Sequence, residues 1–233
     1  SCWDYHQRLN EFLAWLGRLE RGGVPVWNPP GLLRWNSHKA YLRDLAAAGI
    51  PTVPTRWLTR GKPASLAALL RRVGWDDAVV KPAVSASAHE TWRTSPRSAT
   101  QDQARLDALL GQGDVMVQVY FSEVAAPGEW SLVFFGDRFS HATLKRPAAG
   151  DFRVQWEYGG SAVAMSPPPH LLGDAQRALA AVDGRTVYAR VDGVERGGRL
   201  IVTELELIEP HLFLGWEPTA AGRLAHVLAA ALG

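Results

Sequence analysis

The sequence predicts an α+β protein in which a small mixed lobe is followed by a larger antiparallel sheet with helices. The first half combines amphipathic helical patterns with short β-rich runs. In the second half, the turn signals Gly136-Asp137 and Gly197-Gly198 each separate two β-rich runs, a pattern typical of antiparallel hairpins. A chain of 233 residues is long enough for one large domain or two small ones.

Helices are predicted where apolar side chains recur every three or four residues, and strands where β-rich runs are bounded by turn residues. The predicted helices are residues 9–20, 37–48, 66–73, 101–110, 171–182 and 216–232. The predicted strands are residues 24–27, 52–58, 78–81, 115–121, 130–135, 138–145 and two runs within 187–210. Residues 146–169 are rich in Gly, Pro and charge, which predicts a long mobile loop.

Composition excludes several classes of protein. The net charge is only +2 and no Lys/Arg run is present, so neither nucleic acid nor a membrane is expected as a partner. The single cysteine, Cys2, excludes a disulfide framework and a cysteine zinc site, and it favours a cytoplasmic location. No apolar run approaches membrane-spanning length, and no signal peptide is evident. The chain begins without Met, and we expect part of its first domain to be absent.

Residues 187–210 form the acidic hairpin on which the site prediction is built. Because side chains alternate along a strand, Asp192 shares a face with Arg190, and Glu204 with Glu206. Any register that pairs the apolar faces brings these four side chains together. Three gathered carboxylates repel one another unless a cation lies among them, and oxygen ligands on a rigid sheet suit Mg²⁺. A solvated strand face with Arg190 as counter-ion explains the same pattern, so both interpretations stay open.

Lysine is rare in this chain, with four Lys against twenty-one Arg. Each retained lysine is therefore a candidate for a position that needs a compact ammonium group. Lys39 lies in a predicted helix and Lys81 ends a buried strand; each either binds an anion or is an ordinary solvated lysine. Lys145 and Arg146 lie where a strand meets the long loop, and adjacent cations there could hold a phosphate or an anionic intermediate. A solvated loop entrance is the alternative.

Three further segments are candidates for nucleotide contacts. Ser85 and Ser87 belong to a loop of small residues after Lys81, where backbone N–H groups can approach phosphate oxygens, although an ordinary turn fits as well. Glu129 opens a strand and could accept hydrogen bonds from ribose. A third segment is the strand that joins the two lobes, which comprises Gln118, Val119, Tyr120 and Phe121. It either offers backbone groups to adenine or is simply a core strand. Zinc-type histidine spacing, Gly-x-Ser-x-Gly, Walker A and GxGxxG motifs are all missing from the sequence.

Taken in chain order, these segments resemble the ATP-grasp superfamily, whose two α+β lobes grip ATP. The matching segments are Asn36-Ser37-His38-Lys39, Val79-Val80-Lys81-Pro82, residues 85–88, residues 118–121, Gly128-Glu129, Lys145-Arg146-Pro147, Asp192 and Glu204-Leu205-Glu206. Residues 128–147, 149–160 and 204–210 are most similar to ligases of the glutathione-synthetase type, and within these to the cyclo-ligases that form D-cycloserine from O-ureido-D-serine.

The resemblance implies an ADP-forming, ATP- and Mg²⁺-dependent ligase. Such an enzyme activates a small amino-acid-like carboxylate as an acyl phosphate and couples it to a nitrogen nucleophile, either of a second molecule or, as in the cyclo-ligases, of the same molecule. The resemblance also implies that residues 1–35 end a pre-ATP-grasp α/β domain, that residues 36–120 form the small lobe with its lid, and that residues 121–233 form the large lobe with the metal site. The expected partner is a small-molecule substrate, and relatives often form homodimers.

The resemblance also assigns roles to single residues. The implied metal ligands are Asp192, Glu204 and Glu206. The implied ATP contacts are Lys39, Lys81, Ser85 and Ser87 for phosphates, Gln118, Val119, Tyr120 and Phe121 for adenine, and Glu129 for ribose. The implied catalytic residues are Lys145, Arg146, Arg153 and Arg190. Two positions depart from the family pattern, because the phosphate loop lacks glycine and Glu206 stands where an Asn is usual.

Two other classes of protein remain as alternatives at this stage. The first is a nucleotide-binding module without catalysis, and the second is an α+β scaffold whose hairpin is merely acidic.

Overall fold

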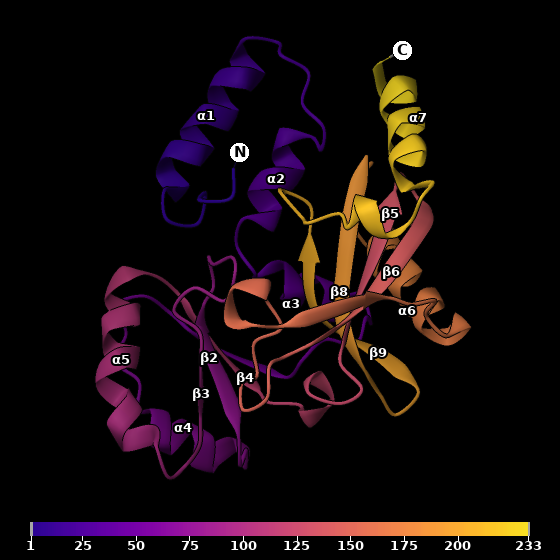
Figure 1. Cartoon of the computed structure of the whole chain (residues 1–233). Helices are drawn as coiled ribbons and strands as arrows, with labels where there is room; N and C mark the ends of the chain where they lie inside the picture. Colours follow the sequence, from indigo (N-terminus) through magenta and orange to yellow (C-terminus); the bar gives the residue numbers. More distant parts are fainter. Residues whose placement is uncertain (1, 233) are drawn as a thin grey trace. The chain divides into compact units, whose positions relative to one another are not determined.

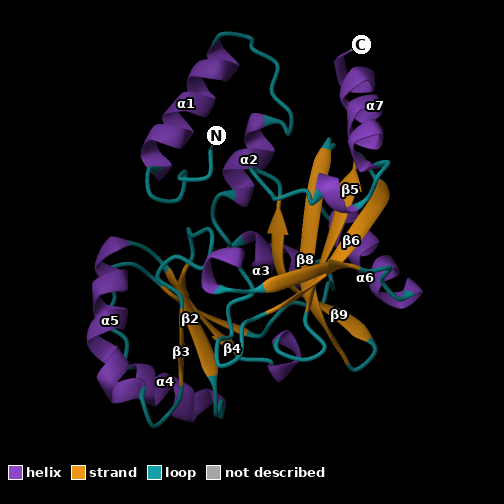
Figure 2. Ribbon diagram, viewed as in Figure 1, coloured by secondary structure: helices purple, strands orange, loops and turns teal. Residues whose placement is uncertain are grey.

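The computed structural model describes residues 2–232, and the chain divides into two compact units. The larger unit comprises the residues up to Thr52 together with those from Glu123 onward. The smaller unit is Val53–Ser122. Each unit has its own antiparallel sheet, as Figures 1 and 2 show. The predicted α+β class is therefore confirmed.

The smaller unit is a four-stranded sheet with two helices on one side. Its strand order is β1-β4-β2-β3, with β1 Thr55–Leu58, β2 Ala78–Pro82, β3 Trp92–Thr94 and β4 Val115–Val119. Helices α4 (Leu66–Val73) and α5 (Ala99–Gln112) lie along this side (Figure 1). Their buried leucines pack against Val80 and Val117. Because side chains alternate along a strand, Lys81 and Gln118 lie on the opposite face.

The larger unit contains a five-stranded sheet in the order β7-β6-β5-β8-β9. The strands are β5 Glu129–Phe135, β6 Arg138–Arg146, β7 Ser161–Ala164, β8 Tyr188–Arg196 and β9 Arg199–Glu206. The two predicted hairpins, β5–β6 and β8–β9, are both present. Strands β5 and β8 also pair with each other, so the two hairpins form one continuous sheet.

Helices surround this sheet. The helices are α1 Leu9–Arg21, α2 Pro30–Asn36, α3 Tyr41–Ala47, α6 Pro169–Ala180 and α7 Ala220–Leu232, with short 3-10 turns at Ser122–Val124, Trp156–Tyr158 and Leu214–Trp216. Helix α6 packs on β8 and β9. Helix α7 packs on β5 and β6, where Leu224 and Val227 contact a cluster containing Val133 and Phe135. Of the helices in residues 2–232, none combines the length and apolarity that a membrane crossing requires.

The outer edge of β9 is covered by side chains from α2 and α3. The Asn36 amide donates to Leu205 O at 2.8 Å and accepts from Leu207 N at 2.9 Å, as a neighbouring strand would. The Tyr41 hydroxyl accepts from Leu205 N at 3.2 Å. Asn28 likewise donates to the carbonyls of Tyr188 and Leu207. These contacts satisfy edge groups that would otherwise be unpaired.

Several predicted elements differ from the structure. Residues 24–27 form no strand, because Val24 is exposed and the segment runs into α2. The predicted helix 37–48 is observed only as α3, because residues 37–40 form turns, and the preceding helix α2 was not predicted. The predicted loop 146–169 contains the edge strand β7, and β3 was not predicted. Residue 52 forms only an isolated bridge with Val202, and the strand begins at Thr55.

The observed units also differ from the expected boundary at residue 36. Residues 36–52 belong to the larger unit, because Asn36 and Tyr41 bond to β9 and the backbone of Pro51 accepts from Val202 N at 2.8 Å. The Asn36 motif therefore has an observed structural role at this sheet edge, next to Lys39 in the helix break.

Candidate active site

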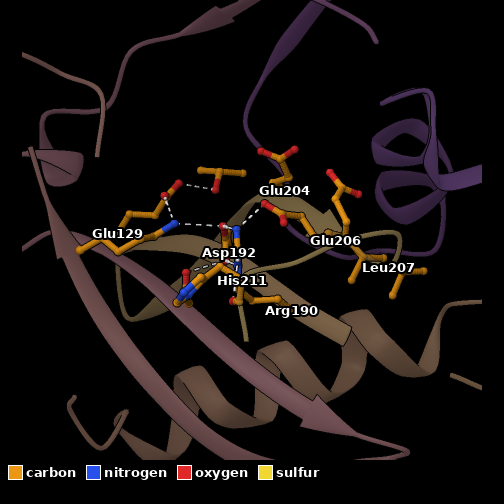
Figure 3. Close-up of polar contacts among 12 residues, drawn as sticks. Glu129, Arg190, Asp192, Glu204, Glu206, Leu207 and His211 are labelled. Carbon is orange, nitrogen blue, oxygen red and sulfur yellow. Dashed lines mark hydrogen bonds and ion pairs between the residues drawn. The ribbon is translucent and has the colours of Figure 1, made fainter. Parts of the chain in front are cut away.

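One face of the larger sheet carries a row of polar and charged side chains, which we call the charge row. Its members are Glu129 and Ser131 on β5, Lys145 on β6, Arg190 and Asp192 on β8, and Glu204 and Glu206 on β9. They are neighbours because the strand registers pair Glu129 with Lys145, Ser131 with Asp192, Asp192 with Glu204, and Arg190 with Glu206. Figure 3 shows Asp192 and Arg190 between Glu129 on one side and Glu206 on the other. The predicted hairpin is present, and its register brings Arg190 and Asp192 beside Glu206 and Glu204 as expected.

Asp192 is the buried centre of the charge row, with only 2% of its surface exposed. Its Oδ1 accepts from Ser131 Oγ at 2.7 Å and from Arg190 Nε at 2.9 Å. Its Oδ2 accepts from Arg190 Nη2 at 2.9 Å and from Lys145 Nζ at 3.0 Å. Burial alone would raise the pKa of Asp192, but the charges of Arg190 and Lys145 hold it well below its usual range. Each carboxylate oxygen therefore already has two donors.

Lys145 connects Asp192 to Glu129. Its ammonium group lies 2.8 Å from Glu129 Oε2 and 3.0 Å from Asp192 Oδ2. Burial lowers the pKa of Lys145, but the charges of Asp192 and Glu129 outweigh it and leave the pKa above its ordinary value. Lys145 is therefore a buried, charged ammonium between two carboxylates.

Glu204 and Glu206 form the more accessible end of the charge row, with about a quarter of each side chain exposed (26% and 25%). Glu204 forms an ion pair with Lys39, and Glu206 forms one with Arg190. Burial, opposed by Arg190 and reinforced by the charges of Glu204 and Asp192, raises the pKa of Glu206 to about 7. Such crowding of carboxylates is relieved when a cation binds among them.

A β-bulge adds a residue to the charge row that strand alternation had placed on the other face. The register shifts between Asp192 and Gly193, so Thr203 has no partner on β8 and its hydroxyl donates to Glu129 Oε1 at 2.7 Å. Gly193 makes the bulge possible, because a Cβ there would lie 2.7 Å from Ile201 O. Neither Thr203 nor Ser131 was predicted; only the alternation Glu129-x-Ser131 could have indicated Ser131.

The donor set of the charge row is compatible with Mg²⁺ in its chemistry, since it offers carboxylate oxygens on a rigid sheet. Within residues 2–232, no group of three acidic, His or Cys side chains is already arranged to hold a metal ion. Glu204 and Glu206 pair with Lys39 and Arg190 and are partly exposed, whereas Asp192 already accepts four hydrogen bonds. Glu204 and Glu206 therefore fit the ion as they stand, and Asp192 would have to exchange a donor for it.

Arg146 and Arg153 make their polar contacts away from the charge row. Arg146 is exposed and donates from Nε to Pro127 O at 2.7 Å. Arg153 holds Asp151 with Nε and Nη2 at 3.1 and 2.8 Å, and its guanidinium lies 3.6 Å from the ring centre of Tyr158. The hydrogen bond from Arg153 lowers the pKa of Asp151 to about 2. Their proposed catalytic roles stay predictions.

The predicted ATP contacts in the smaller unit belong to one sheet face and one loop. Lys81 is partly buried near the end of β2. Ser85 is buried and donates to Pro82 O at 3.1 Å, whereas Ser87 is exposed. The loop holds three non-glycine residues in the left-handed region, Ser87, Ala88 and Glu90, with φ of 49–53°. Glycine would adopt this conformation without strain, and strained loops of this kind cluster at ligand sites.

The predicted adenine-binding stretch is partly used within its own unit. The Gln118 side chain donates to Thr55 Oγ1 at 3.0 Å. The N–H groups of Val119 and Tyr120 donate to the carbonyls of Pro54 and Asp77 at 3.2 and 3.0 Å. Phe121 follows the end of β4. The backbone donors of Val119 and Tyr120 therefore already have acceptors, and the adenine contact stays a prediction.

Comparison with known proteins gives one relative along almost the whole chain. Residues 1–28 match the family model of the D-cycloserine synthetase DcsG N-terminal domain. The cycloserine biosynthesis protein DcsG of Streptomyces lavendulae is 32% identical over 245 residues, which cover 98% of this chain and 80% of that protein. The crystal structure of D-cycloserine synthetase DcsG has a TM-score of 0.88 and 31% identity, covering 100% of this chain and 82% of that one.

Two more distant structures share the fold. A D-alanine–D-alanine ligase from Bacillus anthracis complexed with ATP has a TM-score of 0.71 at 20% identity, covering 92% of this chain and 72% of that one. The ATP-grasp ligase PsnB, complexed with a phosphomimetic variant of its minimal precursor, Mg and ADP, has a TM-score of 0.62 at 18% identity. That match covers 97% of this chain and 69% of the PsnB chain.

Proposed function

Because this chain belongs to the family of ATP-grasp ligases that includes DcsG, we propose that it activates a small amino-acid-like carboxylate as an acyl phosphate. That the chain is an ATP-grasp ligase follows from this relationship. The acyl-phosphate intermediate and the identity of the substrate are what we propose. The observation that supports it best is the charge row, in which buried cations alternate with carboxylates on one sheet face and the carboxylates at one end, Glu204 and Glu206, are partly exposed.

The proposed reaction has two steps. A substrate carboxylate oxygen takes the γ-phosphoryl group of ATP and ADP leaves. A nitrogen then attacks the carbonyl carbon, phosphate leaves, and the nitrogen loses a proton. The first step brings two anions together, and the second builds negative charge on the carbonyl oxygen and the departing phosphate, so fixed cations near these atoms supply much of the catalysis. Arg190 and Lys145 are such cations, because their carboxylate partners hold them in place.

Glu204, Glu206 and Asp192 are the proposed Mg²⁺ ligands. When bound, Mg²⁺ neutralises charge on the ATP phosphates. Glu204 and Glu206 face the open end of the charge row, and Lys39 lies beside Glu204. If Glu204 turned toward the ion, the Lys39 ammonium would be released to contact phosphate oxygens.

For the rest of the ATP molecule we retain the roles implied by the family. Lys81, Ser85 and Ser87 would contact phosphates from the smaller unit, and residues 118–121 would meet adenine. Glu129 would accept hydrogen bonds from the ribose hydroxyls. Its carboxylate oxygens already contact Lys145 and Thr203, so the ribose would share these oxygens with them. The smaller unit would then act as the small lobe, with residues 83–91 as part of its lid.

The proposed substrate is O-ureido-D-serine, in which the carboxylate and the attacking nitrogen belong to one molecule. Attack by the oxygen-bound nitrogen would close a five-membered ring, and addition of water would release the carbamoyl group as carbon dioxide and ammonia. The support is the relationship to DcsG, whose name describes a D-cycloserine synthetase. Arg146 and Arg153 would then stabilise the anionic intermediate and close the long loop over it, excluding water.

The test is an ADP-release screen over carboxylate and amine compounds that includes O-ureido-D-serine. We expect Mg²⁺-dependent ADP formation with that compound. AMP and pyrophosphate as products would contradict the acyl-phosphate scheme. Glu204→Gln should abolish Mg²⁺-dependent turnover, with Asp183→Asn, an exposed carboxylate outside the long loop, as the control. Turnover that survives in Glu204→Gln would mean that the metal site lies elsewhere.

A further inference from the structure

A pocket of about 510 Å³ lies between the β5–β6 turn and the start of α7, two segments that both belong to the larger unit. Figure 1 shows α7 beside the end of β5 and β6. A volume of this size is typical of sites that hold small organic molecules. Phe135 lines the pocket at one end of β5, whereas Glu129 of the charge row begins the strand at the other end. Six residues along a strand span ~20 Å, so the pocket is separate from the charge row.

The floor of this pocket is apolar. Phe135, Phe139 and Val227 line it, together with Pro218. Phe135 is buried and belongs to the same hydrophobic cluster as Val227, so the packing of α7 on the sheet holds both side chains in place. The ring of Phe139 packs edge-to-face against Phe134, with the ring centres 5.8 Å apart. The pocket therefore presents a fixed apolar surface to the body of a ligand.

Three basic side chains also line the pocket: Arg138, Arg223 and His226. In the part of the chain that the structure describes, none of the lining residues is acidic. Arg223 is fixed at one wall, because its Nε donates to Ser140 Oγ and its Nη2 to Ser140 O, both at 3.1 Å, and Glu217 lies 3.6 Å from Nη2. Arg138 is exposed and forms no ion pair with any residue from 2 to 232. The pocket therefore carries positive charge that the protein itself does not neutralise.

We propose that this pocket binds a small organic anion that has an apolar or aromatic body. The apolar floor would cover the body, and the guanidinium group of Arg138 would pair with a carboxylate, phosphate or sulfonate group. The first turn of α7, with its partial positive charge, favours an anion at the same place. An inorganic anion would leave the aromatic floor uncovered, and a neutral apolar compound would leave Arg138 unpaired. The proposal does not depend on the reaction at the charge row.

The test compares two fluorescent probes that differ only in the anionic group. We would titrate the enzyme with 8-anilinonaphthalene-1-sulfonate and with N-phenyl-1-naphthylamine, both in saturating Mg-ADP so that the nucleotide site is not available to them. We expect both probes to bind. Arg138→Gln should weaken binding of the sulfonate by about three- to ten-fold and leave the neutral probe unchanged. Added salt should likewise weaken only the sulfonate.

Gly222→Leu is the variant that fills the pocket. Gly222 lines the pocket in the first turn of α7, and a Cβ there would have no other atom within 4 Å. Because Leu favours a helix more than Gly does, the variant should fold at least as stably as the wild type. It should weaken both probes by about ten-fold or more, since the added side chain occupies their space. Gly111→Leu on α5, where a Cβ also meets nothing, is the matched control and should bind both probes normally.

Three results would overturn the site: no binding of either probe by the wild type, unchanged binding in Gly222→Leu, or equal weakening of both probes in Arg138→Gln. Sulfonate affinity that falls as the protein concentration rises would also contradict the proposal, because a second copy of the chain would then cover the pocket. Each variant must retain a cooperative thermal transition, since the sulfonate probe also binds partly unfolded protein. ADP release is not measured in this test, so its result leaves the proposed reaction untouched.

Discussion

Arg190 holds both oxygens of Asp192, with Nε 2.9 Å from Oδ1 and Nη2 2.9 Å from Oδ2. Both side chains are more than nine-tenths buried. Burial lowers the pKa of Arg190, but the charges of Asp192 and Glu206 raise it well above its usual value. A bidentate ion pair of this kind fixes the orientation of the guanidinium group as well as placing its charge, because the two parallel hydrogen bonds form together in only one orientation. Arg190 also donates to His211 O at 3.1 Å, which ties β8 to the segment after β9.

Arg190→Lys should therefore be costly although it conserves charge. A single ammonium group cannot hold both Asp192 oxygens and also reach Glu206 and His211 O, so buried acceptors lose donors. We expect the free energy of unfolding to fall by about 2–3 kcal/mol. Urea denaturation measures this change, with Arg138→Lys at an exposed position as the control. Equal stabilities of Arg190→Lys and Arg138→Lys would show that the bidentate geometry of Arg190 stabilises the fold no more than its positive charge does.

The Lys145 bridge predicts strong coupling between Glu129 and Lys145. Lys145→Met leaves two carboxylates without their shared ammonium, and removal of one partner of a buried ion pair costs about 3–5 kcal/mol. Glu129→Gln alone should lower the free energy of unfolding by less, because Lys145 still forms its ion pair with Asp192. The double variant should therefore be more stable than the sum of the two single effects predicts. Additive effects in the double-mutant cycle would argue against the bridge.

Much of the charge row follows from local sequence. The alternation of Arg190 with Asp192 and of Glu204 with Glu206 predicts that these side chains share one face of the hairpin, as they do in the structure. The family resemblance then selects a site over a solvated face. The pairing of β5 with β8 is not predictable in this way, because it joins strands separated by more than fifty residues. Lys145 was therefore predicted near phosphate, but its bridge between Glu129 and Asp192 was not.

Other features could not be predicted because they depend on backbone detail. The bulge that turns Thr203 toward Glu129 results from the close approach of Gly193 to Ile201, and strand periodicity does not reveal it. Asn36 was noted only as part of a motif before Lys39, whereas its contacts are to the β9 backbone.

Glu209 predicts a pH dependence of stability. Its pKa is raised to about 8 from a reference value of 4.5, so between these values the unfolded chain loses a proton that the folded chain retains. Stability conferred by the protonated carboxyl is complete below pH 4.5 and is lost as the pH rises toward 8. Glu209→Gln removes this loss, and its advantage over the wild type should grow by about 2–4 kcal/mol from pH 5 to pH 8.5. Urea denaturation at the two pH values measures it.

The comparison of the two proteins is informative because groups far from Glu209 titrate equally in both. Glu206, whose pKa is raised to about 7, titrates over the same range and interacts with Glu209, so the difference between the two proteins reports the removal of Glu209 together with its effect on Glu206. Glu157→Gln should show no such change with pH. A difference between Glu209→Gln and the wild type that stays constant from pH 5 to pH 8.5 would mean that Glu209 is not protonated in the folded protein at neutral pH.

The hydrogen bonds of Asn36 predict a local loss of stability at the edge of the sheet when this side chain is removed. Asn36→Ala leaves Leu205 O and Leu207 N without their side-chain partners in a buried position, and each unsatisfied group costs about 1–3 kcal/mol. Unfolding should occur at lower urea concentration, and the Leu207 amide should exchange with deuterium faster than amides in β5. Asn10→Ala on the exposed side of α1 should change neither quantity appreciably. Because Leu207 follows directly after Glu206, loosening this edge should also weaken Mg²⁺-dependent turnover, whereas unchanged exchange at Leu207 would show that the Asn36 amide does not hold the strand.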